Sequence, residues 1–193
     1  MSFRVAVACE DHTLDQYVVR PVIEKLLASV GKPNAIVKVV SDPRLTGITD
    51  LRDKACEILR RYGAVADVVV FAIDADGEDG LDGRSNRKAN WENLLRKCEE
   101  HDGKAIVVTA VQETEVWAIW GSRAELGVGW QTIRAERDPK EKYFDPLTTP
   151  QDQKEPGRGR TRLINKSLAG GFGPLSNACP ELKVLADEIR ALV

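Results

Sequence analysis

The chain has 193 residues, the length of one ordinary globular domain, and 42% of them are hydrophobic. Its 28 basic and 30 acidic residues give a formal net charge of −2, which excludes a globally basic nucleic-acid coat and a disordered tail protein. No apolar run reaches the roughly 18 residues that span a bilayer, and the N-terminal run is too short and too soon acidic for a signal peptide. We therefore expect a cytoplasmic protein without a membrane partner.

Apolar runs alternate with longer mixed segments over the first 120 residues. Four of the apolar runs predict buried strands: residues 4–9, 35–40, 64–73 and 104–110. The third of them is the most hydrophobic stretch of the chain. Four of the mixed segments predict helices: residues 14–27, 50–61, 86–101 and 113–120. Pro21 marks either a kink in the first helix or a later start of it. This alternation predicts an α/β fold, a parallel sheet with helices on both faces.

The alternation ends near residue 120. Residues 145–160 are rich in proline, glycine and charge and are expected to form a loop, whereas residues 179–193 have the pattern of an amphipathic helix. We expect a single domain over residues 1–193. Its core would cover about residues 1–120, and an irregular C-terminal extension of about residues 121–193 would end in a helix.

The four cysteines, Cys9, Cys56, Cys98 and Cys179, contain no Cys-x-x-Cys pair. A structural zinc site needs closely spaced ligand pairs, so zinc is not expected. In a reducing compartment, free buried thiols are the simpler interpretation.

Acidic residues follow three of the four predicted strands. Glu10 comes after the first, Asp74 and Asp76 after the third, and Glu113 and Glu115 after the fourth. The carboxyl ends of parallel strands share one edge, where ligands bind in α/β proteins. Carboxylates gathered there repel one another unless a cation neutralises them, and their hard oxygens favour Mg²⁺ or Mn²⁺. The sequence therefore predicts a magnesium or manganese site.

Other interpretations of this acidic stretch fit less well. An EF-hand counted from Asp74 needs glycine at position 6 and glutamate at position 12, where the chain has Asp79 and Ser85. The sequence contains no GxxxxGK[ST] phosphate loop, and its two histidines, His12 and His101, are weak candidates for a catalytic triad. Asp-x-Asp-Gly also resembles the nucleophile motif of haloacid-dehalogenase phosphatases, which normally lies on the first strand.

A glutamate after the first strand and Asp-x-Asp after a later one resemble the Toprim pattern of topoisomerases, bacterial primases, recombination-repair proteins and OLD-family nucleases. The resemblance extends to small stand-alone Toprim-like proteins of bacteria and covers most of the chain. Three further segments carry it: Glu113-Thr-Glu115-Val-Trp117, Asp138-Pro-Lys-Glu141 and Arg158-Gly-Arg-Thr-Arg162. One departure is that Asp-His-Thr follows Glu10, where the family commonly has a glycine-rich turn.

The resemblance implies that Glu10 is a metal ligand or general acid/base and that Asp74 and Asp76 hold Mg²⁺. Glu113 or Glu115, with Glu115 slightly favoured, would complete a second metal position, and two metals would support phosphodiester hydrolysis. A topoisomerase needs a nucleophilic tyrosine from another domain, for which this chain has no room, so a nuclease is favoured. Small relatives often accompany an ABC-type ATPase in bacterial antiviral systems, which implies such a partner.

Basic residues near these motifs would contact the DNA or RNA, because arginine forks suit phosphate oxygens. They are Arg84, Arg87, Lys88, Lys140, Arg158, Arg160 and Arg162. The plainer alternative for the last three is a solvated loop. Trp117 and Trp120 are expected in the core, whereas the role of Trp130 stays open.

Two other functions remain open. One is a catalytically inactive Toprim-like subunit that binds a partner protein or nucleic acid, which the unusual turn after Glu10 would suit. The other is a glycosyltransferase with Asp74-Ala-Asp76 as its metal motif, although no nucleotide-sugar site is visible in the sequence.

Overall fold

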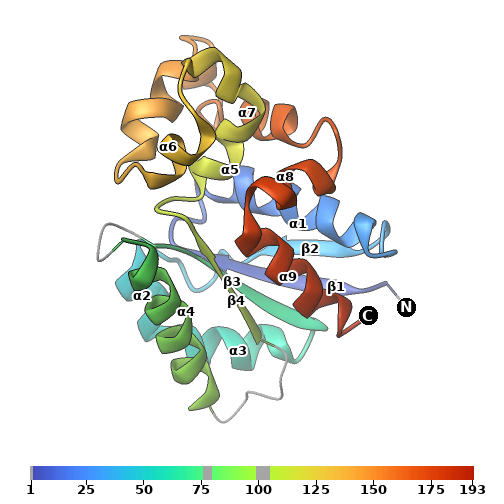
Figure 1. Cartoon of the computed structure of the whole chain (residues 1–193). Helices are drawn as coiled ribbons and strands as arrows, with labels where there is room; N and C mark the ends of the chain where they lie inside the picture. Colours follow the sequence, from blue (N-terminus) through green and yellow to red (C-terminus); the bar gives the residue numbers. More distant parts are fainter. Residues whose placement is uncertain (1, 76–79, 99–104) are drawn as a thin grey trace.

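The protein is an α/β fold built on a four-stranded parallel sheet (Figure 1). The computed structural model describes residues 2–75, 80–98 and 105–193, with the backbone alone over residues 80–85. The strands follow the order β2-β1-β3-β4, and each neighbouring pair is parallel. Their bounds are Arg4–Cys9 (β1), Ile36–Val39 (β2), Val68–Asp74 (β3) and Ala105–Ala110 (β4). All four predicted strands are present, and the predicted fold class is confirmed.

Helices cover both faces of the sheet. On one face α2 (Ile48–Asp53), α3 (Ala55–Gly63) and α4 (Gly80–Arg96) pack against alternate strand residues such as Phe71. On the other face α1 (Gln16–Ser29), α5 (Glu115–Ile119) and the C-terminal helices pack against the intervening residues, such as Val70. Side chains alternate between the faces of a strand, so central strands covered on both sides must be apolar throughout.

The C-terminal extension is more ordered than its sequence predicts. After α5 come a 3-10 helix (Trp120–Leu126), α6 (Trp130–Ala135), a π-helical turn (Lys140–Phe144) and 3-10 turns at Asp145–Leu147 and Asp152–Lys154. The chain then forms α7 (Arg160–Ser167), α8 (Phe172–Ala178) and α9 (Pro180–Arg190). The expected final helix is confirmed, and the expected loop over 145–160 contains the two 3-10 turns. Buried residues of α7, α8 and α9 join the same core as α1 and the sheet.

Helices α4 and α9 pack on opposite sides of β4, the last strand of the sheet. The ammonium of Lys88 on α4 lies 2.8 Å from a carboxylate oxygen of Glu188 on α9. This ion pair therefore joins the two helical layers across the outer edge of the sheet.

The expectation that all four cysteines are free is wrong for two of them. Cys56 of α3 and Cys98, which follows α4, form a disulfide with a Cα–Cα distance of 5.3 Å. The two helices lie on the same face of the sheet, so packing brings together thiols that are 42 residues apart. Cys9 and Cys179 are free and buried, as expected. No helix among the described residues is long and apolar enough to cross a membrane.

Candidate functional site

The ends of β1, β3 and β4 bring Glu10 and Asp74 into contact. Glu10 directly follows β1, and its Oε1 accepts a hydrogen bond of 2.9 Å from the backbone N–H of Asp74, the last residue of β3. Asp74 is the register partner of Ala110 at the end of β4. Its Oδ1 accepts a second backbone hydrogen bond, of 2.8 Å, from Thr114. The backbone thus fixes both half-buried carboxylates at the carboxyl edge of the sheet, as the sequence predicts.

A cation reaches the same edge from α4. The guanidinium of Arg87 donates a hydrogen bond to the backbone carbonyl of Asp74. Its neighbour Lys88 instead pairs with Glu188, and more loosely with Glu92 at 3.7 Å. Of these two predicted nucleic-acid contacts, only Arg87 lies against the carboxylate site.

Negative charge is concentrated behind this edge. Burial raises the pKa of the Cys9 thiol well above its ordinary value, and four nearby carboxylates raise it further. In order of decreasing effect they belong to Asp15, Asp11, Asp74 and Glu10. The carboxyl end of β1 is therefore a place where one more negative charge is unfavourable and a cation is favourable.

Glu113 lies beyond the end of β4 and is held by the extension. Its Oε2 accepts a hydrogen bond of 3.0 Å from the backbone N–H of Lys140 in the π-helical turn. Burial, followed by the negative charge of Glu115, raises the pKa of Glu113 to about 7. The side chain of Glu113 is therefore close to half protonated at neutral pH.

Glu115 and Arg160 form a buried ion pair. Glu115 is 4% exposed and Arg160 is 3% exposed, and the Arg160 guanidinium lies over the ring of Phe144, 5.2 Å from its centroid. The sequence assigned these two residues separately, to a metal and to a nucleic acid. In the structure each is the other's partner and neither faces the solvent.

Asp15 is a buried carboxylate that the sequence analysis missed. It is 8% exposed, and its Oδ2 accepts a hydrogen bond of 2.8 Å from the backbone N–H of Asp11. Burial is the main reason that its pKa rises to about 7, and the charges of Glu115 and Asp11 add to the effect. An aspartate in a polar turn before a helix gives no signal of burial, and the charges of Glu115 and Arg160 that act on it come from much later in the chain.

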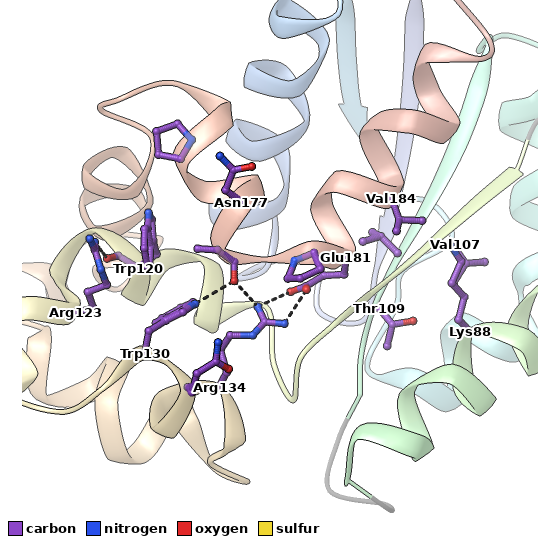
Figure 2. A pocket seen from close by; sticks show the side chains of 15 residues that line it. Lys88, Val107, Thr109, Trp120, Arg123, Trp130, Arg134, Asn177, Glu181 and Val184 are labelled. Atoms are coloured by element: carbon purple, nitrogen blue, oxygen red, sulfur yellow. Dashed lines mark hydrogen bonds and ion pairs between the residues drawn. The ribbon is translucent and has the colours of Figure 1, made fainter.

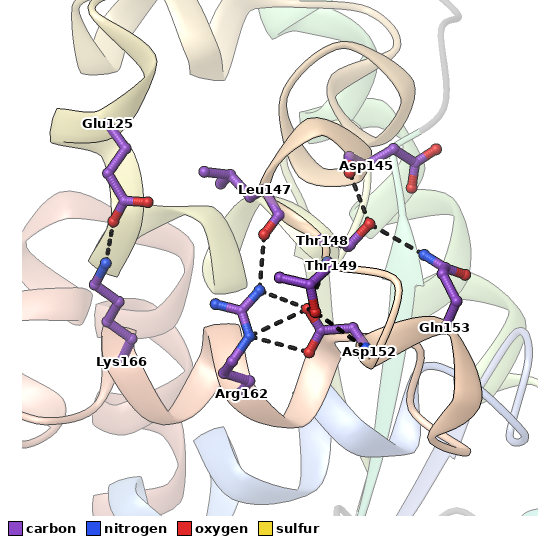
Figure 3. Close-up of polar contacts among 9 residues, drawn as sticks. All are labelled: Glu125, Asp145, Leu147, Thr148, Thr149, Asp152, Gln153, Arg162 and Lys166. Carbon is purple, nitrogen blue, oxygen red and sulfur yellow. Dashed lines mark hydrogen bonds and ion pairs between the residues drawn. The ribbon is translucent and has the colours of Figure 1, made fainter.

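The remaining candidate residues do not join the site. Arg162 binds Asp152 through two of its nitrogens, at 2.7 and 3.0 Å, and donates a further hydrogen bond to the carbonyl of Leu147 (Figure 3). Its guanidinium holds the pKa of the Asp152 carboxyl well below the usual range. Arg158 is exposed, with a positive φ of 47°. The side chain of Arg84 and all of Asp76 lie outside the described residues.

Among the described residues, the carboxylates at this edge of the sheet are ligands that suit a hard cation. Glu10 and Asp74 supply two carboxylates at one edge, and oxygen ligands of this kind are those that Mg²⁺ and Mn²⁺ prefer. Within residues 2–75, 80–98 and 105–193, no three acidic, histidine or cysteine side chains are arranged to hold a metal ion. Asp76, the third expected ligand, lies outside that part of the chain.

The sequence matches no protein-family model, no curated protein and no solved structure.

Proposed function

We propose that this protein is a Mg²⁺- or Mn²⁺-dependent nuclease that hydrolyses phosphodiester bonds of DNA or RNA. The observation that carries the proposal is the contact between Glu10 and Asp74 at the carboxyl ends of adjacent parallel strands. The order of acidic motifs that resembles Toprim enzymes supports it. The excess negative charge around Cys9 supports it too, because a bound cation would relieve that charge.

Glu10, Asp74 and Asp76 would hold the metal ion. When bound, the ion would polarise the phosphoryl oxygens and lower the pKa of a bound water. The backbone N–H of Thr114 orients the Asp74 carboxylate, and Arg87 adds positive charge beside it that favours a phosphate. Glu113, half protonated near neutral pH, lies beyond the same edge and can hold or give up a proton there.

The cellular setting that we propose follows from the resemblance. The protein would be the effector of a bacterial antiviral system and would act in the cytoplasm with a separate ABC-type ATPase. In that reducing compartment the Cys56–Cys98 pair would be present mainly as two thiols.

The test is a cleavage assay with circular DNA, linear DNA and a structured RNA in Mg²⁺ or Mn²⁺. The wild type should cleave at least one of these polymers, and chelation of the metal should stop it. Glu10→Gln and Asp74→Asn keep the side-chain volumes but remove the charges that would hold the metal, so each should lower the rate at least about a hundredfold. Glu24→Gln, which removes an exposed carboxylate of α1, is the matched control and should cleave at the wild-type rate.

A second candidate function is an inactive subunit that binds a partner protein or nucleic acid. The buried pair between Glu115 and Arg160 favours it, because this pairing takes one carboxylate away from a second metal position. This function predicts that the wild type cleaves nothing in either metal. It also predicts that Asp74→Asn binds its partner as tightly as the wild type does.

A further inference from the structure

A groove of about 860 Å³ runs along the outer side of β4, between that strand and the C-terminal extension (Figure 2). In Figure 2, Trp120, Trp130 and Arg123 lie toward one end, and Lys88, Val107 and Thr109 toward the other. The ion pair of Arg134 and Glu181 lies between the two ends. None of the site residues discussed above lines this groove, except Lys88.

Planar side chains form the first end of the groove. The rings of Trp120 and Trp130 meet at an angle of 66°, with their centroids 5.0 Å apart. The guanidinium carbon of Arg123 lies 3.4 Å from the centroid of Trp120, and one of its nitrogens donates to the Trp120 carbonyl. Among the described residues no carboxylate forms an ion pair with Arg123, so its charge is available to an anionic ligand.

The middle of the groove is hydrogen-bonded and electrically balanced. Glu181 accepts a hydrogen bond of 2.8 Å from Arg134, and the indole N–H of Trp130 donates to the carbonyl of Ala178 at 3.0 Å. These contacts hold Trp130 in place and neutralise the Glu181 carboxylate. The positive charge of Arg123 is therefore not cancelled from within the groove.

The other end holds a buried polar group that lacks a protein partner. Thr109 of β4 is 6% exposed and lines the groove, and its Oγ1 has no hydrogen-bond partner among the described residues. A buried hydroxyl without a partner costs about 1–3 kcal/mol, so native proteins usually satisfy such groups with protein, water or ligand. The oxygen itself is covered in this structure, so a ligand in the groove would bond to it only after the Thr109 side chain rotates.

This end of the groove adjoins the candidate metal site. Thr109 is the register partner of Ile73, and the next pair along the two strands is Ala110 with Asp74. Lys88 at the same end follows Arg87, which contacts the carbonyl of Asp74. A chain molecule that lies in the groove can therefore continue toward Glu10 and Asp74.

We propose that this groove binds a single-stranded segment of nucleic acid and leads it to the Glu10–Asp74 site. Bases would stack at the Trp120–Arg123–Trp130 end, and the sugar-phosphate backbone would pass Lys88 and Thr109. Aromatic rings and arginine planes bind bases of any sequence in this way, and the unpaired charge of Arg123 attracts the phosphates. The proposal deepens the proposed nuclease function and rests on it for the choice of polymer.

The test measures the affinity of the full chain for a fluorescein-labelled oligothymidine strand by anisotropy, in EDTA so that no hydrolysis occurs. Arg123→Gln should weaken binding about tenfold, because it removes both a charge and a stacking plane. Arg20→Gln, which removes an exposed cation of α1, is the matched control and should bind as the wild type does. Thr109→Val should weaken binding about threefold without lowering the stability of the protein, because its hydroxyl bonds to no described residue.

Hydrolysis of the small ester bis(p-nitrophenyl) phosphate, measured beside the binding, separates this proposal from the nuclease proposal. If neither the ester nor any of the three polymers is cleaved but Arg123→Gln alone lowers strand affinity, the groove proposal stands and the nuclease proposal fails. If the ester is cleaved but Arg123→Gln and Arg20→Gln bind the strand equally, the groove proposal is overturned. It is also overturned if thymidine monophosphate competes as well as the strand does, or if the strand does not bind and the groove serves a partner protein.

Discussion

Arg160 supplies the positive charge that compensates the buried carboxylates near it. It pairs with Glu115 and also acts electrostatically on Asp15, so one buried cation faces two buried carboxyl groups. Removing one partner of a buried ion pair leaves the other charge without compensation, which typically costs 3–5 kcal/mol. We expect Arg160→Met to lower the free energy of unfolding by about 3 kcal/mol, measured by urea denaturation at neutral pH.

The double variant Arg160→Met with Glu115→Gln provides the control. It removes both charges and leaves groups of similar size, so it should recover a large part of the lost stability. If the double variant were less stable than Arg160→Met, charge compensation would not be the reason that this pair matters.

The raised pKa of Asp15 predicts a pH dependence of stability. Its pKa rises from 3.8 to about 7 on folding, so between these values the folded protein holds a proton that the unfolded chain has lost. The contribution of Asp15 to stability is therefore fully present below about pH 4, falls as the pH rises, and is lost above about pH 7. Glu113, whose pKa is also raised to about 7, acts in the same direction.

Asp15→Asn should therefore flatten the profile. Asparagine stays neutral at every pH, and its carbonyl oxygen can still accept the hydrogen bond from Asp11. In urea denaturation at about pH 5 and pH 8 in EDTA, the wild type should lose stability with rising pH and Asp15→Asn clearly less. Glu24→Gln should follow the wild type. A wild type as stable at pH 8 as at pH 5 would contradict this prediction.

At the scale of elements, one glycine sets how closely α7 approaches the 3-10 helix that follows α5. The backbone N–H of Gly121 donates to Oγ of Ser167 on α7 at 2.8 Å, and that hydroxyl donates to the carbonyl of Ala118 at 2.9 Å. A Cβ at position 121 would lie 2.4 Å from the backbone nitrogen of Ser167. Backbone atoms cannot move away as a flexible side chain can.

Gly121→Ala should therefore force α7 away from the 3-10 helix Trp120–Leu126 and destabilise the protein by about 3 kcal/mol. Gly63→Ala, at the end of α3, is the control, because a Cβ there would meet nothing within 4 Å. Thermal unfolding of the two variants measures the difference. Equal melting temperatures would show that the 3-10 helix and α7 do not pack closely at Gly121.

The strands could be predicted because the pattern that produces each strand lies within its own residues. A run such as residues 68–74 is apolar throughout and rich in β-branched residues, as a strand buried on both faces must be. The short helices α6, α7 and α8 were not predicted. A helix of six to eight residues shows few repeats of an apolar pattern, and packing rather than propensity stabilises it.

At the scale of the whole molecule, one part of the candidate site could be predicted from local sequence patterns, and another part depends on packing between distant segments. The contact of Glu10 with Asp74 follows from strand order, since parallel strands end at a common edge. The burial of Glu115 and Arg160 depends on how the extension folds back over α1 and α5, which no local pattern encodes. For this reason the sequence could nominate the acidic residues but could not distinguish Glu113 from Glu115.

The disulfide should raise the free energy of unfolding of the whole chain. Cys56 and Cys98 are 42 residues apart in the sequence, and loop-closure entropy gives such a cross-link about 4 kcal/mol. Reduction should lower the free energy of unfolding by up to this amount. Because Cys56 is exposed, reduction should also release a thiol that reacts with Ellman's reagent in the folded protein.

Cys9 and Cys179 are the internal controls for this measurement. Both are buried, and burial raises the pKa of each thiol, so neither should react before unfolding. If the folded protein still showed reactive thiols after mild oxidation and before reduction, the pairing of Cys56 with Cys98 would be incorrect.

The ion pair of Lys88 and Glu188 has a consequence for how copies of this chain behave when they meet. The last strand of a sheet is a template on which a strand of another molecule can pair, and such pairing leads to aggregation. Here a strand approaching the outer edge of β4 would first have to separate two partly buried opposite charges that bridge the helices on either side. Lys88 and Glu188 thus protect the end of the sheet against growth by addition of further strands.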